Sequence, residues 1–146
     1  FEAAAPVNSV EWKVAAVTIE DQPLYGYRGM HLDVSRHFMP MWFIKRYIDL
    51  LAYHKMNYFH WHLTDDQGWR VQIDAYPLLT EKSAWRDNTI VGHTHDRNPF
   101  FDQTPEGGFY TKAQIREIVA YASERQITII PEIDIPGHAS AILHAY

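Results

Sequence analysis

A run of apolar and aromatic residues that ends in adjacent carboxylates constrains the fold of this chain more than any other feature. The run covers residues 58–63, and Asp65 and Asp66 follow it after one threonine. Residues 31–37 and 131–138 repeat this design, because each combines a short apolar strand with acids, histidines or an arginine. Polar side chains at strand ends add little stability, so three such ends predict one polar pocket above a barrel of strands.

The order of the expected elements predicts an α/β fold. A strand over residues 30–34 is followed by a helix over 41–55, a strand over 58–63, a helix that begins after Thr111, and a strand over 127–133. This alternation is typical of the opening of an α/β barrel or of a doubly wound sheet. The last strand is nearly continuous in apolar residues, as expected for a parallel strand covered on both sides.

Periodicity and capping signals place the two helices. The first should bury one stripe of residues at three- and four-residue steps, namely Phe43, Ile44, Tyr47, Leu50, Leu51 and His54. Pro40 fits its first turn, and Asn57 is expected to terminate it. Thr111 and Gln114 form a capping box for the second helix. The face that this helix should bury consists of Ile115, Ile118, Val119 and Ala122.

The remaining segments are expected to be connections. Residues 64–110 show little helical periodicity, and because they leave the polar end of a strand we interpret them as an excursion on the substrate side. Within them, residues 71–73 are typical of a small extra strand. Residues 1–25 are interpreted as a linker or the end of a preceding small domain, with a linker at 3–6 and a short strand at 14–19.

Composition excludes several classes of function. The net charge of −5, with no basic stretch, argues against a nucleic-acid partner, and the absence of cysteine removes disulfide and thiolate chemistry. No apolar run approaches the roughly 18 residues of a membrane-spanning helix.

The chain opens with Phe1 and stops at Tyr146 just after a new strand-loop-helix signal has begun. We therefore expect it to be a piece of a longer protein.

The polar strand ends have both functional and structural interpretations. Arg36 offers five donors in a rigid fork that suits a carboxylate or vicinal hydroxyls, and its structural alternative is a surface ion pair with an aspartate. Asp65 and Asp66 are expected to diverge; either could accept from a sugar, orient a histidine, bind a metal, or cap a helix or turn. His138 follows a Pro-Gly turn and is either held by a carboxylate or caps the next helix.

His60 and His62 share one face of the strand at 58–63. The other face carries the apolar side chains Phe59, Trp61 and Leu63, which should meet the helices, so both imidazoles should point inward. Metal-dependent hydrolases use a His-x-His pair of this kind, but a metal site would need further ligands from later strands. We favour a structural or ligand-contacting role, and we expect no metal or other cofactor.

Taken together, four stretches resemble the family 20 glycoside hydrolases, the β-N-acetylhexosaminidases. They are Tyr27-Arg-Gly-Met-His-Leu-Asp-Val-Ser-Arg-His-Phe38, Phe59-His-Trp-His-Leu-Thr-Asp-Asp-Gln-Gly-Trp-Arg70, Tyr110-Thr111 and Pro131-Glu-Ile-Asp-Ile-Pro-Gly-His138. The resemblance implies that residues 26–146 are the amino-terminal portion of a (β/α)8 barrel, an incomplete TIM barrel with about three of its eight strands. Residues 1–25 then resemble the exit from the small domain that often precedes this barrel.

The resemblance also implies a reaction. The family cleaves terminal β-linked N-acetylglucosamine or N-acetylgalactosamine from oligosaccharides or glycoconjugates by a retaining, substrate-assisted mechanism that needs no metal or organic cofactor. The catalytic Asp-Glu pair should lie on the fourth strand, beyond His138, and Glu132 and Asp134 are not that pair. We therefore expect this chain alone to be inactive and to fold poorly.

By resemblance, Arg36 binds sugar hydroxyls far from the scissile bond, and Asp65 is an active-site acid. His138 is linked to the catalytic glutamate and has Asp65 and Asp134 as carboxylate partners, with Asp66 as the fallback for Asp65.

Two other functions stay open. One is a metal-dependent barrel hydrolase built on His60 and His62, and the other is a non-catalytic sugar-binding barrel. The polymeric substrates of the family favour an extracytoplasmic location.

Overall fold

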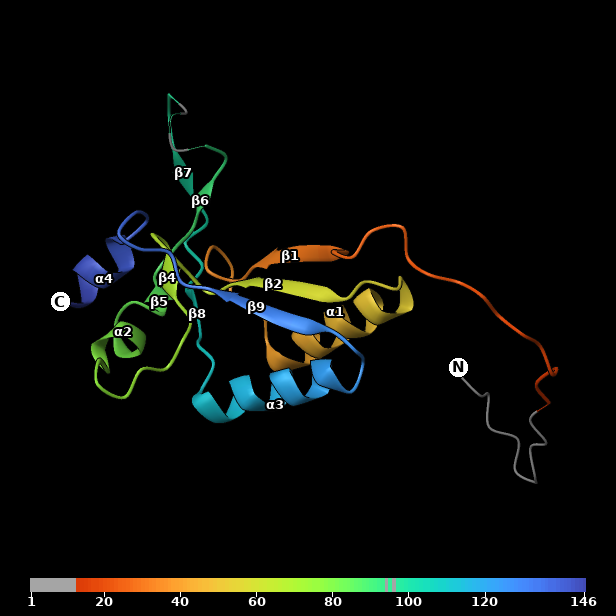
Figure 1. Ribbon diagram of the computed structural model, residues 1–146. Coiled ribbons are helices and arrows are strands. Elements are labelled where there is room, and N and C mark those ends of the chain that lie inside the picture. Colours follow the sequence, from red (N-terminus) through yellow and green to blue (C-terminus); the bar gives the residue numbers. More distant parts are fainter. Residues whose placement is uncertain (1–12, 94, 96) are drawn as a thin grey trace, which may run out of the picture.

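The computed structural model describes residues 13–93, 95 and 97–146. A three-stranded parallel sheet with the strand order β1–β2–β9 lies at its centre (Figure 1). The strands are β1 (Gly29–Asp33), β2 (Tyr58–His62) and β9 (Thr128–Glu132). Because the strands are parallel and helices lie between them in sequence, the predicted α/β class is confirmed.

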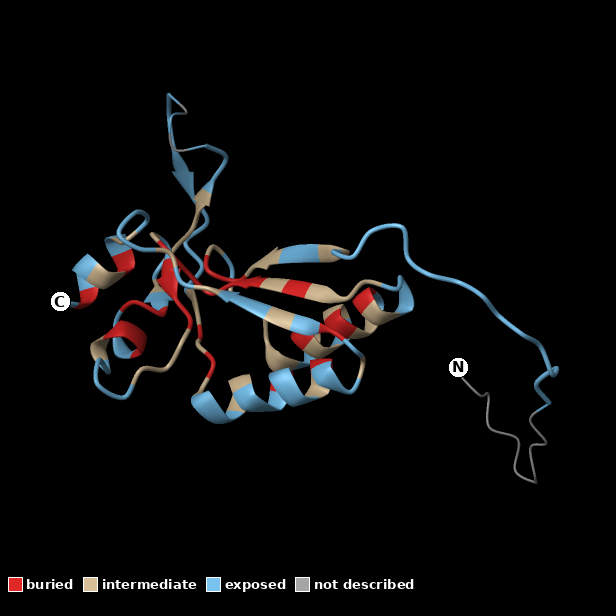
Figure 2. Ribbon diagram, viewed as in Figure 1, coloured by how far each residue is buried: buried red, intermediate tan, exposed pale blue. Residues whose placement is uncertain are grey.

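Two helices, α1 (Met41–Tyr53) and α3 (Lys112–Ser123), cover one face of this sheet (Figure 1). Buried residues concentrate along β2 and on the sides of the helices that face it (Figure 2). The alternation predicted for the middle strand is confirmed, since Phe59, Trp61 and Leu63 are at most 2% exposed. The core cluster consists of Val34, Ile44, Ile48, Leu51, Phe59, Trp61, Leu63, Tyr110, Ile118, Ala122 and Ile127.

The first helix forms where it was predicted, but its buried stripe differs. Its buried residues are Ile44, Ile48 and Leu51. Leu50 is 43% exposed and His54 is exposed, so their predicted burial is wrong, and Ile48 is missing from the predicted stripe. Periodicity alone defines a stripe only to within about one position, whereas contact with β2 decides which side of the helix is covered.

The end of α1 also differs from the prediction. Pro40 is the N-cap residue and has extended backbone, and the helix ends at Tyr53. The chain reverses at Lys55, whose φ of 57° lies in the left-handed region. Asn57 is not the terminator: its side-chain oxygen accepts the backbone N–H of Arg28 at 2.9 Å and so links the starts of β1 and β2.

The predicted capping box of α3 is confirmed. The Thr111 hydroxyl accepts from the Gln114 N–H at 3.2 Å, and the Gln114 side chain accepts from the Thr111 N–H at 2.9 Å. Ile118 and Ala122 are fully buried, and Ile115 packs against the same core. Val119 is 47% exposed, so its predicted burial is wrong.

The face of the sheet opposite α1 and α3 is open in the described part of the chain. Thr128 and Ile130 of β9 are exposed on this face, so the prediction that this strand is covered on both sides is wrong for this structure. His31, His60 and His62 project from the open face, where their rings contact one another. The prediction that His60 and His62 point away from the helices is confirmed.

Residues 64–110 are more ordered than a plain loop. They contain β3 (Thr64–Asp65), β4 (Gly68–Trp69), α2 (Leu78–Glu81), β5 (Trp85–Arg86), β6 (Ile90–Val91), β7 (Phe100–Phe101) and β8 (Glu106–Gly107). The predicted strand at 71–73 is wrong, because Val71 makes only an isolated bridge with Tyr110. The β6–β7 hairpin projects away from the sheet (Figure 1). The excursion leaves from the carboxyl end of β2, as predicted.

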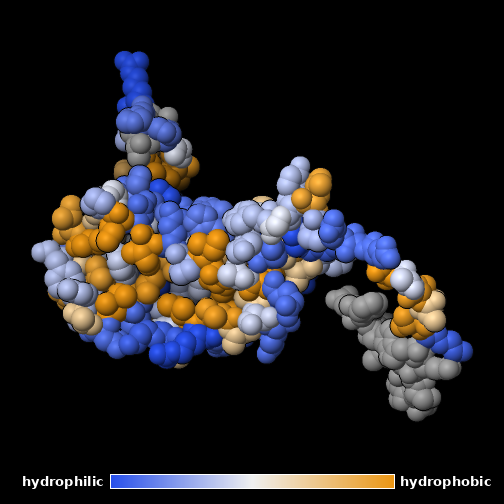
Figure 3. Space-filling view, in the orientation of Figure 1, coloured by the Kyte–Doolittle hydropathy of each residue, from blue (hydrophilic) through white to orange (hydrophobic). Residues whose placement is uncertain are grey.

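A second, smaller apolar cluster lies beside the sheet. Helix α4 (Ser140–Ala145) packs against α2, β3 and β4, with Trp69, Leu79, Ala141 and Ala145 buried between them. Apolar side chains also gather on the outer surface in this region (Figure 3). Leu143 of α4 is 77% exposed. This cluster fixes the segment that follows β9 against the excursion that follows β2.

The amino-terminal segment departs from the prediction. Residues 14–19 form no strand, and Val14, Val17 and Ile19 are 91%, 65% and 77% exposed. The linker predicted at residues 3–6 lies outside the described residues. Among the residues that are described, no helix combines the length and the apolar character that crossing a bilayer requires.

Candidate active site

The parallel register brings polar side chains together at the carboxyl ends of the strands. Asp33 of β1 lies opposite His62 of β2, which lies opposite Glu132 of β9. Side chains on one face of a strand recur every second residue, so these three occupy the same row of the open face. His31 and His60 form the preceding row. The sheet alone therefore gathers two acids and three imidazoles.

Asp65 is the centre of the site and is only 2% exposed. Its Oδ2 lies 2.7 Å from Arg36 Nη2 and 2.9 Å from His62 Nε2. Its Oδ1 accepts the backbone N–H of Asp66 at 2.7 Å and lies 3.2 Å from His138 Nδ1. Arg36, Asp65 and His138, which the sequence placed at three separate strand ends, are thus brought together by the structure.

Arg36 is held by acceptors on three sides. It donates through Nη1 to Asp33 at 2.8 Å and through Nε to Gln67 at 2.9 Å, in addition to its contact with Asp65. The ion pair with an aspartate that the sequence left as an alternative is therefore present. The side chain nevertheless stays 42% exposed, so it can also reach a ligand.

Asp33 has a part in the site that sequence reasoning did not assign. Its Oδ1 accepts the backbone N–H groups of Ser35 and Arg36 at 2.8 and 3.0 Å. Burial raises the pKa of Asp33, but the hydrogen bonds from Arg36 and Ser35 outweigh this effect and hold that pKa below its usual range. The signal in the sequence is an aspartate two residues before Ser35, the spacing of an Asx turn.

Asp65 and Asp66 do not diverge as predicted, because both carboxylates contact His138 Nδ1, at 3.2 and 3.1 Å; they differ in their other partners. Asp66 Oδ1 accepts from the N–H and hydroxyl of Ser140 at 3.1 and 2.7 Å, so it caps the start of α4. These bonds lower the pKa of Asp66. The capping alternative is thus realised by Asp66, while Asp65 takes the buried position.

His138 is fixed by its backbone and by carboxylates. Its φ of 50° is left-handed, and its Nδ1 lies 3.1 Å from Asp66 Oδ2 and 3.2 Å from Asp65 Oδ1. The hydrogen bond to Asp66 and then the charge of Asp65 raise its pKa. Asp134, the other predicted partner, makes no hydrogen bond or ion pair with His138 within the described residues. Its N–H bonds Thr64 Oγ1.

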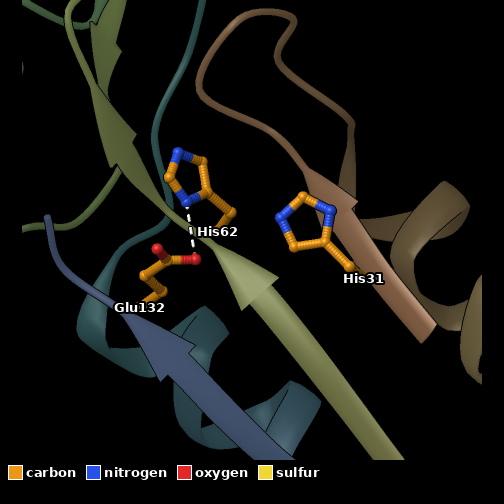
Figure 4. A group of neighbouring side chains, drawn as sticks. All are labelled: His31, His62 and Glu132. Atoms are coloured by element: carbon orange, nitrogen blue, oxygen red, sulfur yellow. Dashed lines mark ion pairs between the residues drawn. The ribbon is translucent and has the colours of Figure 1, made fainter. Parts of the chain in front are cut away.

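His31, His62 and Glu132 form a second group of polar side chains, one from each strand of the sheet (Figure 4). Potential ligand atoms of these three side chains lie within 4.8 Å of one another. Glu132 Oε2 lies 2.7 Å from His62 Nδ1 and 2.6 Å from His60 Nε2. Both nitrogens of His62 already face carboxylates, so these side chains satisfy one another's hydrogen-bonding groups. The absence of a metal stays a prediction.

Arg70 is a structural residue of the site that sequence reasoning left without a role. It is 1% exposed and donates to the backbone carbonyls of Val34, Ser35, Ala84 and Gly108, at 3.0, 2.7, 2.6 and 3.1 Å. It therefore ties the segment that precedes Arg36 to the excursion after β2. Arg70 Nη2 also lies 3.9 Å from Glu106 Oε1, and the burial of this arginine cannot be read from its neighbours in sequence.

A cavity of about 790 Å³ adjoins the site. Its lining includes Asp66 and Gln67, which contact His138 and Arg36, together with Trp85, Glu106 and His144. Trp85 is 56% exposed and presents an aromatic surface beside it. The cavity places open space next to the polar cluster on the side formed by the excursion.

The fold and the site define part of an α/β domain that carries a polar site at the carboxyl ends of parallel strands. The family model for the glycosyl hydrolase family 20 catalytic domain matches residues 25–146. The chain therefore belongs to this family, as its motifs indicated.

Named relatives agree with this assignment. The chain is 51% identical over 134 residues to a β-hexosaminidase from Vibrio furnissii, and 52% identical over 133 residues to a β-hexosaminidase from Porphyromonas gingivalis. These matches cover 90% and 91% of this chain but 21% and 16% of the relatives. The chain thus spans about a fifth of the length of such relatives.

Solved structures show the same likeness. The chain superimposes with a TM-score of 0.75 and 50% identity on a GH20 exo-β-N-acetylglucosaminidase from Vibrio harveyi in complex with N-acetylglucosamine, over 86% of this chain and 19% of that one. A second β-N-acetylhexosaminidase structure gives a TM-score of 0.77 at 42% identity, over 86% of this chain and 25% of the other.

Proposed function

We propose that the complete protein is an exo-β-N-acetylhexosaminidase that releases terminal β-linked N-acetylglucosamine or N-acetylgalactosamine. The observation that carries this proposal is the position of Asp65, which is buried between Arg36 and His138. The family membership and the names of the relatives support the same activity.

We propose further that β1, β2 and β9 are the first three of eight strands in a (β/α)8 barrel. Three features support this: the strands are parallel, both helices lie on one face, and the polar groups gather at the carboxyl ends. In such a barrel the open face would become the interior. Residues 26–146 would form the start of the barrel, and residues 1–25 the end of a preceding small domain.

In the proposed reaction the acetamido oxygen of the substrate attacks its own anomeric carbon while a glutamic acid protonates the leaving oxygen. Arg36 would bind hydroxyls of the terminal sugar with the donors that its acceptors leave free. His138 turns Nδ1 toward Asp65 and Asp66, so Nε2 would face the glutamic acid that we expect on the following strand. Asp65 and Asp134 would supply the negative charge around that imidazole.

The decisive experiment is an assay of the full-length protein with aryl β-N-acetylglucosaminide and β-N-acetylgalactosaminide. We expect turnover with retention of anomeric configuration by proton NMR, and none from residues 1–146 alone. Sugar binding without turnover would identify a non-catalytic barrel instead. Stoichiometric zinc with activity lost on chelation would favour the metal-dependent alternative, with His31, His62 and Glu132 as the cluster to test.

We also propose an extracytoplasmic location, because polymers and glycoconjugates are met outside the cytoplasm. Fractionation of the source cells, followed by the same aryl glycoside assay, tests this. Activity confined to the cytoplasmic fraction would contradict it.

A further inference from the structure

The ring of His62 is held between two carboxylates that come from different strands. Nε2 lies 2.9 Å from Asp65 Oδ2, and Nδ1 lies 2.7 Å from Glu132 Oε2, while the side chain is only 6% exposed. An ionised carboxylate can only accept hydrogen bonds, so both ring nitrogens must donate. A histidine with two donating nitrogens is an imidazolium, which here carries the charge that two neighbouring acids require.

The charged surroundings of His62 favour this state. Burial lowers the pKa of His62, but hydrogen bonds to Glu132 and Asp65 outweigh that effect, so its pKa lies above the ordinary value. The titratable and charged groups that face the ring from the surrounding elements are Asp65, Glu132, Asp33, Arg36, His31 and His60. Three of these groups are acids, and the closest two are the ones that contact the ring.

The two oxygens of Asp65 have different partners. Oδ2 faces two cationic side chains, Arg36 and His62, whereas Oδ1 accepts the N–H of Asp66 and faces His138. The two cations on one side therefore fix the orientation of the carboxylate, so that its other oxygen is presented to His138. Rotation of the carboxylate would break contacts on both sides at once.

His62 is the more rigid of the two groups on Oδ2. Arg36 is 42% exposed, shares its donors with Asp33 and Gln67, and is the residue expected to bind sugar. His62 is buried and is held at its far side by Glu132, which His60 contacts in turn at 2.6 Å. The contacts His60–Glu132–His62–Asp65 thus form a series that runs across the open face of the sheet to the site.

We propose that His62 is a positioning residue, whose doubly protonated ring fixes Oδ2 of Asp65 and thereby presents Oδ1 to His138. This inference rests on the proposed hexosaminidase function and extends it by one residue. His62 acts through Asp65 and does not itself touch the sugar.

Two substitutions separate the two hydrogen bonds of His62. The amide of glutamine takes the place of Nε2, so His62→Gln keeps a donor toward Asp65. The amide of asparagine takes the place of Nδ1, so His62→Asn keeps only the donor toward Glu132. In the full-length enzyme we expect His62→Gln to lower kcat by less than about 10-fold and His62→Asn by about 100-fold, because loss of orientation at a reacting centre has costs of that order.

The control is His54→Gln, which changes an exposed histidine at the end of α1 remote from the site. It should keep the kcat of the wild type. Equal losses of kcat in His62→Gln and His62→Asn, with melting temperatures that agree, would overturn the proposal and make His62 a packing residue. An inactive wild-type enzyme would instead contradict the proposed function.

A measurement on the unaltered protein covers the case in which neither variant folds. A neutron structure of the full-length protein at neutral pH should show deuterium on both Nδ1 and Nε2 of His62. Deuterium on only one of them would overturn the proposal, because the other nitrogen could then no longer donate to its carboxylate. This result does not depend on turnover, so it stays informative if the enzyme acts on a different glycoside.

Discussion

At the scale of single residues, Arg36 divides its donors among Asp33, Asp65 and Gln67. The planar guanidinium has five N–H donors, so these three contacts leave part of the fork for a ligand and hold it in a fixed direction. The ammonium of lysine has only three N–H donors, all on one atom, so it cannot reproduce the planar fork and still keep a donor for a ligand. Arg36→Lys in the full-length enzyme should therefore lower kcat/KM, and the loss should correspond to about 2–4 kcal/mol of transition-state stabilisation. Most of the effect should appear in KM.

The measurement for this substitution is steady-state kinetics with an aryl β-N-acetylglucosaminide. Arg116→Lys, at an exposed position of α3, is the matched control and should leave the kinetics as they are. Wild-type values for Arg36→Lys would remove Arg36 from the substrate site and leave it with the ion pairs alone.

The contact between Asp66 and His138 should weaken both at low pH and at high pH. Bonds from Ser140 lower the pKa of Asp66 below 3.8, and Asp66 raises the pKa of His138 above 6.5. The contribution of Asp66 is complete above its unfolded pKa and disappears as pH falls through its folded pKa. That of His138 is complete below its unfolded pKa and disappears as pH rises through its raised folded pKa. Both are therefore present together between these two ordinary values.

Thermal unfolding of the wild type and of Asp66→Asn across pH tests this expectation. The difference in melting temperature should be largest between pH 3.8 and 6.5 and should shrink toward both extremes. A difference that does not shrink above pH 6.5 would show that the hydrogen bonds to Ser140, and not the charge pair with His138, are what Asp66 contributes.

At the scale of elements, α3 offers two adjacent apolar residues with opposite environments. Ile118 is fully buried against the sheet, whereas Val119 is 47% exposed. Ile118→Ala should reduce the free energy of unfolding by about 2–5 kcal/mol, because it leaves a cavity in the core. Val119→Ala should change it by less than about 0.5 kcal/mol. Urea unfolding of the full-length protein measures both, and equal losses would mean that α3 packs in a different rotation.

Elements whose pattern is local could be predicted, and those that depend on distant contacts could not. The alternation of β2 follows from backbone geometry, and the capping box of Thr111 and Gln114 is complete within four residues. The side of α3 that is covered, which excludes Val119, depends on where the sheet lies. The segment at 14–19 has the composition of a strand but lacks a sheet partner among the described residues, so it has no regular structure and is exposed.

The site follows the same rule. Arg36, Asp65 and His138 could be named because they stand in motifs at strand ends. Asp33 and Glu132 join them only because the parallel register sets both beside His62. Which of Asp65 and Asp66 takes the buried position depends on whether α4 folds back so that Asp66 can cap it. No local pattern specifies either of these long-range contacts.

At the scale of the whole molecule, three segments far apart in sequence are joined around the site. Arg70 ties the end of β1 to the excursion through carbonyls of both. Asp66 joins the same excursion to α4. The site is therefore assembled within the described residues. The sheet that supports it is open, because β1 and β9 are its outer strands and each pairs only with β2.

The open edges of this sheet predict how residues 1–146 behave alone. Exposed strand edges and apolar surface promote association. Met30 and Ile130 are 50% and 38% exposed on the sheet. An open apolar pocket of about 540 Å³ is lined by Trp69, Ile73, Tyr76, Leu79, Ile133, Ile142 and Tyr146. We expect the isolated chain to bind a hydrophobic dye and to self-associate in sedimentation experiments, and the full-length protein to do neither.

One substitution should act in opposite directions in the two proteins. Ile130 lies beside His60 on the face that would be the interior of the proposed barrel. Ile130→Lys adds a charge to an exposed edge strand of the isolated chain, so it should reduce self-association there. In the full-length protein the same lysine would enter a packed interior without a partner, so it should lower the melting temperature markedly. If Ile130→Lys leaves the full-length protein as stable as the wild type, this face of the sheet is not enclosed, and the barrel proposed for the complete protein is wrong.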